Sequence, residues 1–481
     1  MQEYQLLLSF FTNVLFVMAL GWYLITNLQW YDYKLTRVVL KHHKVWWHIF
    51  YFVVPFVLYH ILPESFGVFL AFGYLPALWL WHKKLDKKLV LTWRVKRFLI
   101  VLFVLVFLQD IVCSFKASCA QYGAFLPLIL AYGFSSVVEK YLFMVYKKEA
   151  KKKLNSFKNL EIVAITGSYG KTSIKNFVAQ VLATKFNVYA TPRSVNTIGG
   201  IVADVNNNLK DNVEVYVAEA GARERGDIYE ITSFLEPQRV VVGKVGLAHI
   251  EYFKTLENIV ATKLEIMQSP KLQKAYIHTS VTDEPHPKVE FFGNGVKNVV
   301  ATLQSTEFDL ELDGEHVHFS TQLLGTFQAQ NLEVAIKIAK SFGMSNQEII
   351  DAVAKIKPVE HRLQRIDAGG KIILDDGYNG NIDGMLEAIR LCSLHNGRKV
   401  IVTPGLVESS DELNVKLIEA INDVFDIVIV TGSLNKELFQ KHLHVKNSIF
   451  LEDKANLTDT LAKQTQSGDI ILFANDAPSF I

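Results

Sequence analysis

The stretch AITGSYGKTSIKNF at residues 164–177 decides the fold of this chain, because it has the composition of a phosphate-binding loop. The apolar run NLEIVAIT (159–166) leads into it and a helical apolar pattern follows, so the context is strand, loop and helix. Glycines let the backbone approach phosphate oxygens, a lysine places its charge on the outer phosphates, and a threonine hydroxyl can complete a magnesium shell. Ile165 stands where the full motif has its first glycine, so a glycine-rich turn that caps a helix is the alternative interpretation. The residues expected to bind the nucleotide are Gly167, Ser168, Gly170, Lys171, Thr172 and Ser173.

Two further strands are each expected to deliver a functional side chain at or just after their ends. In the segment VEVYVAEAGARERGDI (213–228), the first residues are expected to form a strand that ends at Glu219. A carboxylate at that position can hold magnesium opposite the phosphate loop. The segment RVVVGKVGLAHIEYF (239–253) places His249 just past the next strand. Further along the chain, ATKLEI places Lys263 on a helix, and for that residue a surface lysine is the simpler interpretation.

The first 150 residues differ in composition from the rest of the 481-residue chain. They carry 15 Lys/Arg against 7 Asp/Glu, a net charge of +8, whereas the remainder carries 35 against 41, a net charge of −6. The mean hydropathy of +0.19 is high for a soluble protein. Nucleic acid is not an expected partner, because the basic residues are interleaved with apolar segments and form no continuous stripe.

The front of the chain is predicted to be a membrane domain of about five helices. Apolar segments near the length that crosses a bilayer lie at about 6–28, 46–62, 66–82, 98–115 and 122–138. A removed signal peptide is not expected, because the opening MQEYQ has no basic residue and no small-residue cleavage site follows the first segment. A re-entrant hairpin is the alternative for the second and third segments, since prolines interrupt them. These prolines are Pro55, Pro63 and Pro76.

The basic residues follow the first, third and fifth segments, and the other connections are nearly free of them. By the positive-inside rule these basic connections are cytoplasmic, so that everything after residue 150 lies in the cytoplasm, where ATP is available. Three cysteines exclude a disulfide framework, although Cys113 and Cys119 could pair in an oxidising compartment or could be packing residues. The basic residues are Lys34, Arg37, Lys41 and Lys44, then Lys83, Lys84, Lys87, Lys88, Arg94, Lys96 and Arg97, then Lys147, Lys148 and 151–153.

The last third of the chain alternates strands and helices, which predicts a small doubly wound domain with a parallel sheet. The expected domains are therefore 1–150 in the membrane, 151–357 with the phosphate loop, and 358–481. The strands are expected at KIILDDGY (371–378), KVIVTPG (399–405), DIVIVTG (426–432) and DIILFAND (469–476), with helices at about 383–395, 411–423 and 434–442.

Seven short motifs, taken in their order and spacing, resemble the Mur ligases, which are ATP-dependent amide-forming enzymes of peptidoglycan assembly. The resemblance covers residues 155–481, and EAGARERGDI (219–228) is most similar to the MurF type, which adds D-alanyl-D-alanine. The resemblance implies a central P-loop Mur ligase domain and a C-terminal Rossmann-like domain. The motifs are TGSYGKTS, TPRSVNTIGG, EAGARERGDI, HIEYF followed by ATKLEI, GTFQAQN, EHRLQ and DDGYNGN.

The resemblance assigns a role to each matching residue. Lys171 and Thr172 would hold ATP and its magnesium, and Glu219 and His249 would ligate metal. Lys263 matches a lysine that becomes a carbamate, which is a carboxylate-like ligand able to hold a second magnesium ion. Asn331 would contact adenine, Arg362 phosphate and Asp376 ribose, although a solvated linker arginine is the alternative for Arg362. The residues expected near the substrate are Asn196, Thr197, Arg223, Tyr378, Asn379 and Asn381.

Several positions depart from the family pattern. Phe327 and Gln328 stand where the family usually has His and Asn, and NGNI (379–382) stands where it has NANP. FANDAPSF (473–480) replaces the usual KGSR, which leaves the acceptor contacts open. The soluble UDP-binding domain that begins MurF-type enzymes has no counterpart in the first 150 residues.

The expected function is ligation of D-alanyl-D-alanine to UDP-N-acetylmuramoyl-tripeptide through an acyl phosphate, with ATP and Mg²⁺ as cofactors. The apolar segments and the positive-inside rule predict a multi-pass protein of the inner (cytoplasmic) membrane with cytoplasmic catalytic domains, and the resemblance implies that the membrane is bacterial. Membrane lipid is therefore a further expected partner. A ligase or amidating enzyme acting on a lipid-linked muramoyl-peptide is one alternative. An ATP-driven transporter is another, but the chain has no second nucleotide motif such as LSGGQ.

Overall fold

The computed structural model divides the chain into two compact units, Met1–Tyr146 and Lys147–Ile481. Each unit is described by itself below. The structure describes residues 2–31, 33–40, 42, 44–63, 65–85, 88–114, 124–193, 195–246, 253–378, 380–407 and 409–475.

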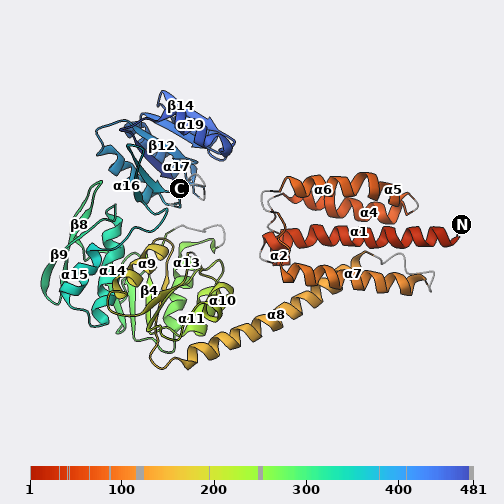
Figure 1. The fold of residues 1–481 in the computed structure, drawn as a ribbon, viewed down its shortest axis with the longest axis horizontal. Helices are drawn as coiled ribbons and strands as arrows, with labels where there is room; N and C mark the ends of the chain where they lie inside the picture. Colours follow the sequence, from red (N-terminus) through yellow and green to blue (C-terminus); the bar gives the residue numbers. More distant parts are fainter. Residues whose placement is uncertain are drawn as a thin grey trace. The chain divides into compact units, whose positions relative to one another are not determined.

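The first unit is helical, and a helix lies at each of the five predicted apolar segments (Figure 1, red to orange). Among the described residues, two helical stretches are long and apolar enough to cross a membrane, Leu7–Trp30 and Phe125–Ser156, and Val45–Ile61 is a shorter apolar helix. This differs from the five spans predicted, since the second, third and fourth segments are not among these stretches. The second and third segments are divided into short helices, whereas the fourth lies in the 22-residue helix α7. The helices are α1 (Gln2–Trp30), α2 (Leu35–Leu40), α3 (Val45–His48) with η1 (Ile49–Val53) and α4 (Val54–Ile61), α5 (Phe66–Phe69) with η2 (Leu70–Tyr74) and α6 (Leu75–Lys83), α7 (Trp93–Ser114) and α8 (Phe125–Ser156).

Two prolines are accommodated inside these short helices by wide turns. Pro55 and Pro76 are each the second residue of the α-helix that follows a π-helical stretch, η1 or η2. A proline ring clashes with the carbonyl four residues earlier and supplies no N–H, and a π turn opens the helix at that point. Two membrane spans and a re-entrant hairpin would both contain helices of this kind, so the helices do not distinguish these two alternatives for residues 46–82.

The second unit begins with a six-stranded parallel sheet in the order β2-β3-β1-β4-β5-β6. Because β1 lies between β3 and β4, the loop after β1 opens near the ends of both neighbours. The strands are β1 (Glu161–Thr166), β2 (Val188–Ala190), β3 (Val215–Glu219), β4 (Arg239–Val242), β5 (Lys274–His278) and β6 (Val289–Phe292), and the helices are α9 (Lys171–Leu182), α10 (Ile198–Asn207), α11 (Asp227–Leu235), α13 (Leu256–Leu264) and η4 (Glu265–Gln268).

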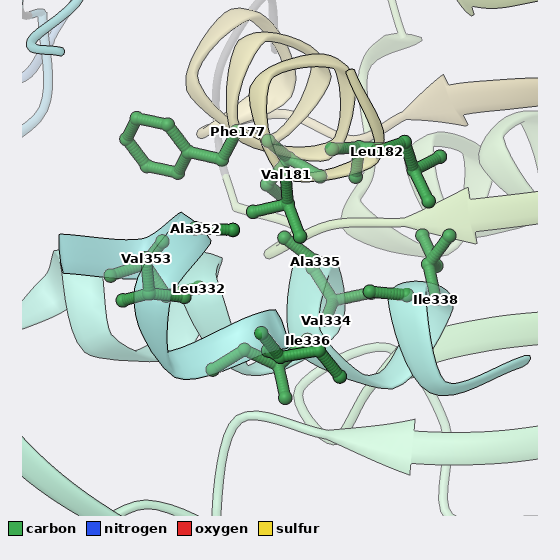
Figure 2. Packing of buried hydrophobic residues seen from close by; sticks show 14 of the residues in the cluster. Phe177, Val181, Leu182, Leu332, Val334, Ala335, Ile336, Ile338, Ala352 and Val353 are labelled. Carbon is green, nitrogen blue, oxygen red and sulfur yellow. The ribbon is translucent and has the colours of Figure 1, made fainter. Parts of the chain in front are cut away.

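The helix that follows the phosphate loop is buried in the largest core cluster. Figure 2 shows Phe177, Val181 and Leu182 of α9 facing Ala335 of α14. Burying one such apolar side chain stabilises the fold by about 1.5–3 kcal/mol, so this packing fixes α9 and with it the loop. The remaining elements of this part are the antiparallel β7 (Lys297–Ala301), β8 (Thr306–Leu312) and β9 (Glu315–Thr321), followed by α14 (Phe327–Ser341) and α15 (Asn346–Ala354).

The last part of the chain has the predicted alternation of strands and helices, around a sheet in the order β10-β11-β15-β12-β13-β14. All neighbours are parallel except β10 and β11. The elements β10, β14 and α19 were not predicted. The strands are β10 (Gln364–Ala368), β11 (Lys371–Asp376), β12 (Lys399–Thr403), β13 (Ile427–Thr431), β14 (Asn447–Leu451) and β15 (Ile470–Ala474), and the helices are α16 (Ile382–Ser393), α17 (Asp411–Val424), α18 (Lys436–His442), η5 (Lys454–Asn456) and α19 (Leu457–Gln464).

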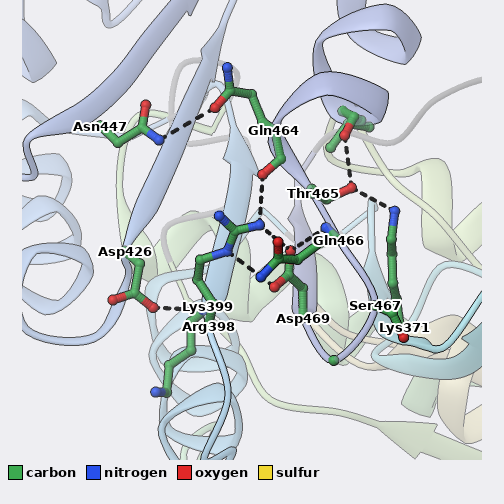
Figure 3. Close-up of polar contacts among 12 residues, drawn as sticks. Lys371, Arg398, Lys399, Asp426, Asn447, Gln464, Thr465, Gln466, Ser467 and Asp469 are labelled. Carbon is green, nitrogen blue, oxygen red and sulfur yellow. Dashed lines mark hydrogen bonds and ion pairs between the residues drawn. The ribbon is translucent and has the colours of Figure 1, made fainter.

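A buried carboxylate fixes the entry into β15. Asp469 is 1% exposed, accepts hydrogen bonds from Arg398 Nε at 3.1 Å and Nη2 at 2.8 Å, and accepts another from the Gln466 backbone N–H at 2.8 Å (Figure 3). Asp469→Ala leaves these donors without their acceptor, so we expect the free energy of unfolding of the second unit to fall by about 2 kcal/mol. Denaturant titration measures this change. Asp426→Ala, which removes an exposed carboxylate that accepts from Lys399 N, should cost less, and equal losses would contradict the role of burial.

Candidate active site

The phosphate loop has a backbone that requires glycine at two positions. Gly167 and Gly170 have φ of +149° and +77°, and a Cβ on Gly170 would lie 2.9 Å from Asn331 Oδ1. Lys171 Nζ folds back over the loop, donating to the carbonyl oxygens of Gly167 at 2.9 Å and Ser168 at 3.1 Å. Burial lowers the pKa of Lys171, and the negative charge of Glu219 opposes that shift. An amine held against carbonyl oxygens in this way is available to anionic oxygens that enter the loop.

Glu219 lies beside this loop because of the pairing between β1 and β3, in which Ile165 is opposite Glu219. The carboxylate is 1% exposed; Oε2 accepts from the Thr172 hydroxyl at 3.0 Å and Oε1 from Asn196 Nδ2 at 3.1 Å. A hydroxyl and a carboxylate side by side are the hard oxygen donors that Mg²⁺ prefers, together with water and substrate phosphates. These residues therefore fit the predicted magnesium site. Within the described part of the chain there is no group of three or more His, Cys, Asp or Glu that could hold a metal, and His249 lies outside the described residues.

Lys263 is buried rather than on the surface, so the interpretation as a surface lysine is wrong. Its residue is 3% exposed, and its Nζ lies 5.9 Å from the centre of the Phe253 ring. Burial, and then the nearby charge of Lys171, lower the pKa of Lys263 to about 7. At neutral pH much of this side chain is therefore the free amine, which is the form that reacts with carbon dioxide. The carbamate itself stays a prediction.

A cavity gathers predicted residues from both catalytic parts of the second unit. Arg362 lines it and donates to the Tyr378 carbonyl, while Asp376 lines it and accepts from the Leu363 N–H at 3.0 Å. Burial lowers the pKa of Arg362. The predicted residues that line the cavity are Gly170, Ser173, Asn331, Arg362, Asp376 and Asn381, and the others are Tyr169, Lys244, His278, Phe327, Gln330, Asp383 and Gly384.

Four of the predicted substrate residues that the structure describes are not among those lining this cavity. One of them, Asn196, donates instead to Glu219. The Thr197 hydroxyl caps α10 by accepting from Gly200 N at 3.3 Å, Arg223 lies exposed, and Tyr378 lies 65% exposed with its ring 4.8 Å from that of His361. Asn379 and Cys119 lie outside the described residues. The roles of these residues stay predictions.

Two lysines near the site were missed. Lys244 pairs with Asp383 at 2.7 Å, which joins the end of β4 to α16, and Lys175 lies 3.4 Å from Glu219. Nothing in the local sequence distinguishes Lys244. Lys175 follows Lys171 by four residues on a helix, and that spacing places both side chains on one face, so the signal for it was present.

The fold and the site together define a P-loop nucleotide-binding protein of the α/β class. Residues 165–339 match the sequence profile of the Mur ligase middle domain. The chain is 27% identical to the UDP-N-acetylmuramoyl-tripeptide–D-alanyl-D-alanine ligase of Bacillus subtilis over 334 residues, which is 65% of this chain and 72% of that protein. It is also 27% identical to the ligase of that name from Escherichia coli, over 52% of this chain and 59% of that protein.

Solved structures give the same result. The MurF ligase of Thermotoga maritima in complex with ADP superposes with a TM-score of 0.61 at 26% identity, covering 69% of this chain and 80% of that one. The predicted resemblance to the Mur ligases, and to the MurF type among them, is therefore confirmed.

The lowered pKa of Lys263 predicts a stability cost that depends on pH. The folded protein binds fewer protons at this amine than the unfolded chain does between pH 7 and 10.5, so the cost is full below about pH 7 and disappears above 10.5. In CO₂-free buffer, Lys263→Met should raise the Tm at pH 7 by about 2 °C or more, with a smaller gain at pH 10. Lys355→Met, at an exposed position, is the control. A gain that does not change with pH would contradict this explanation.

Proposed function

We propose that this chain is an ATP-dependent amide ligase that adds D-alanyl-D-alanine to UDP-N-acetylmuramoyl-tripeptide. The observation that carries the proposal is a cavity in which loop residues Gly170 and Ser173 meet Arg362 and Asp376 of the last domain. We take the two substrates from the similar ligases of Bacillus subtilis and Escherichia coli, whose names state them. ATP would enter with its phosphates on the loop and its base toward Asn331.

The chain's own residues would position the reacting groups. The terminal carboxylate of the peptide attacks the γ-phosphorus of ATP and ADP leaves, which gives an acyl phosphate. The amine of D-alanyl-D-alanine then attacks the acyl carbon, phosphate leaves and a proton is released to solvent. Lys171 and Arg362 place positive charge where the phosphoryl group carries negative charge. Mg²⁺, held by Thr172 and Glu219, would neutralise further charge on the phosphates.

Substitutions at the loop and the carboxylate test this proposal. Lys171→Ala and Glu219→Ala should each lower ATP-dependent ligation by about 100-fold or more, because each removes charge or ligands that act on the phosphoryl group. Phosphate release by detergent-solubilised protein measures the activity. Lys185→Ala, which removes an exposed lysine paired with Glu348, should retain it. Wild-type activity in either site variant would remove the site from the mechanism.

The same assay separates two candidate substrates. The alternative function, ligation or amidation of a lipid-linked muramoyl-peptide, is favoured by the helical unit that precedes the matched region. The assay therefore offers D-alanyl-D-alanine with the UDP-linked peptide or with its lipid-linked counterpart. Turnover of the UDP-linked peptide supports the first proposal, and turnover of the lipid-linked form alone supports the second.

We also propose that the helical unit binds the membrane. Among the described residues, all but seven of the exposed large apolar side chains lie between residues 7 and 146. Exposed apolar surface of this extent is typical of a protein in contact with lipid or a partner. On α7, for example, the apolar residues Phe103 and Phe107 are exposed, whereas Leu102 and Val106 are buried. This helix is therefore apolar both where it packs inside the unit and where it is exposed.

Aromatic and basic residues gather where several of these helices end, which supports the same proposal. All seven tryptophans of the chain lie between residues 22 and 93. The Trp47 ring lies 6.2 Å from Trp30 and 5.5 Å from Trp81, so the ends of α1, α3 and α6 meet. Tryptophan and basic residues are enriched at membrane interfaces, and the basic side is cytoplasmic. Cations lie over rings in the pairs Lys44–Trp47, Lys83–Trp79, Arg94–Tyr33 and Lys96–Trp93.

Membrane binding predicts two results. The full chain should sediment with membranes and stay there after alkaline carbonate extraction, because buried helices are not released by high pH. In vesicles, lipids brominated near the headgroup should quench its tryptophan fluorescence more strongly than lipids brominated at the chain end. Release of the full chain into the carbonate supernatant would contradict insertion of its helices.

A further inference from the structure

Lys175 is a buried lysine to which the proposed reaction gives no role. Its residue is 1% exposed, and it lies one helical turn after Lys171 on α9. Moving an ammonium group out of water costs several kcal/mol, so a lysine at this depth requires compensating groups. The groups that compensate its charge therefore indicate what the side chain does.

One of these groups is the carboxylate expected to hold magnesium. Lys175 Nζ lies 3.4 Å from Glu219 Oε2, the same oxygen that accepts from the Thr172 hydroxyl at 3.0 Å. Two residues of α9 therefore fix this oxygen, and Asn196 Nδ2 fixes the other oxygen at 3.1 Å. Three donors leave the carboxylate little freedom to rotate.

A second group is the carbonyl oxygen of Arg193, which accepts a hydrogen bond from Lys175 Nζ. Arg193 has φ of +46°, a conformation that is unusual and costly for a residue with a side chain. The Arg193 side chain is exposed, and its carbonyl oxygen points to the buried ammonium of Lys175. The strained backbone conformation therefore occurs at the residue that makes this contact.

The loop that carries Arg193 is also tied to the end of β3. Thr191 Oγ1 accepts from the Glu219 N–H at 3.2 Å, and the Asn196 carbonyl accepts from the Gly221 N–H at 2.7 Å. A Cβ on Gly221 would lie 2.8 Å from Asn196 Cγ, so the two segments are in close contact. Lys175 thus joins the nucleotide helix, the carboxylate and this loop at one buried point.

We propose that Lys175 is a positioning residue that holds the Glu219 carboxylate and the loop carrying Arg193 and Asn196 in the arrangement that receives Mg²⁺ and the peptide substrate. The inference rests on the proposed function, since it assumes that Glu219 and Thr172 hold the cation that accompanies the nucleotide. The ammonium acts through these groups and does not itself contact the nucleotide. Its removal should therefore weaken the magnesium-dependent part of nucleotide binding while the magnesium-independent part persists.

The test measures ADP binding to the full-length, detergent-solubilised protein by calorimetry at increasing MgCl₂. Lys175→Met removes the charge and leaves an unbranched side chain that is shorter by one atom. We expect ADP affinity without Mg²⁺ to stay within about twofold of wild type, and the MgCl₂ concentration for half-maximal enhancement to rise about tenfold or more, as for other residues that orient metal ligands.

The control is a partly buried lysine–glutamate pair in the same domain, in which only the glutamate is fully buried. Lys337 lies 3.1 Å from Glu333, donates to the Phe291 carbonyl at 2.7 Å, and has a side chain 17% exposed. Lys337→Met should lower the Tm and leave the MgCl₂ requirement unchanged. An unchanged requirement in Lys175→Met, or an equal rise in both variants, would overturn the inference. Absence of magnesium-dependent ADP binding in the wild type would instead overturn the proposed function.

A second variant covers the case in which Lys175→Met does not fold. Arg193→Gly keeps the carbonyl acceptor, suits the positive φ and loses no buried side chain, so it should fold. Because glycine loosens the loop, we expect the KM for the muramoyl-peptide to rise about threefold or more while ADP affinity without Mg²⁺ is unchanged. An unchanged KM would overturn the part of the inference that concerns the loop.

Discussion

The register between β1 and β3 is the constraint on which the site depends. It sets Ile165 opposite Glu219, so the carboxylate emerges beside the loop that begins after β1. Side chains alternate between the faces of a sheet, and a shift of one residue would turn Glu219 to the other face, away from Thr172. The core under α9 maintains this register, because Phe177 and Val181 fix the helix that carries Thr172 and Lys175. Packing and chemistry are therefore coupled through one helix and one strand pairing.

Much of the fold could be predicted because its parallel strands are buried on both sides and read as continuous apolar runs, such as IVIVT at 427–431. In the last domain, the two strands that escaped prediction are the less buried ones. β14 has no fully buried residue, and β10 pairs antiparallel at the edge of its sheet. For β8 and β9 the signal was present, since apolar residues alternate on both sides of the Asp313–Gly314 turn. Pro55 and Pro76 did indicate that the second and third segments are interrupted, but hydropathy alone predicted each of these segments as one span.

The residues of the site also fall into those that the sequence could predict and those that it could not. Residues of the loop and the strand end could be predicted because their chemistry requires a fixed local spacing, as for Gly170 and Thr172. Contacts between residues far apart in the sequence could not be predicted, because only the tertiary fold brings Lys244 to Asp383 or Lys175 to the Arg193 carbonyl. Thr197 shows the opposite case, in which a motif residue placed near the substrate uses its hydroxyl to cap a helix. A motif therefore identifies a neighbourhood more reliably than it identifies the contact of each side chain.

The balance of charge explains why this neighbourhood is suited to a polyphosphate. Lys171, Lys175 and Lys263 all have pKa values lowered by burial, and they share few carboxylates, of which Glu219 is the most buried. Buried amines are poorly solvated, and the charge of Lys171 further lowers the pKa of Lys263, so holding these cations here costs free energy. An anionic ligand would relieve that cost on binding, and a carbamate on Lys263 would convert one of the three cations into an anion. Active sites commonly sacrifice stability in this manner, and the gain is charge held ready where the reacting phosphoryl group needs it.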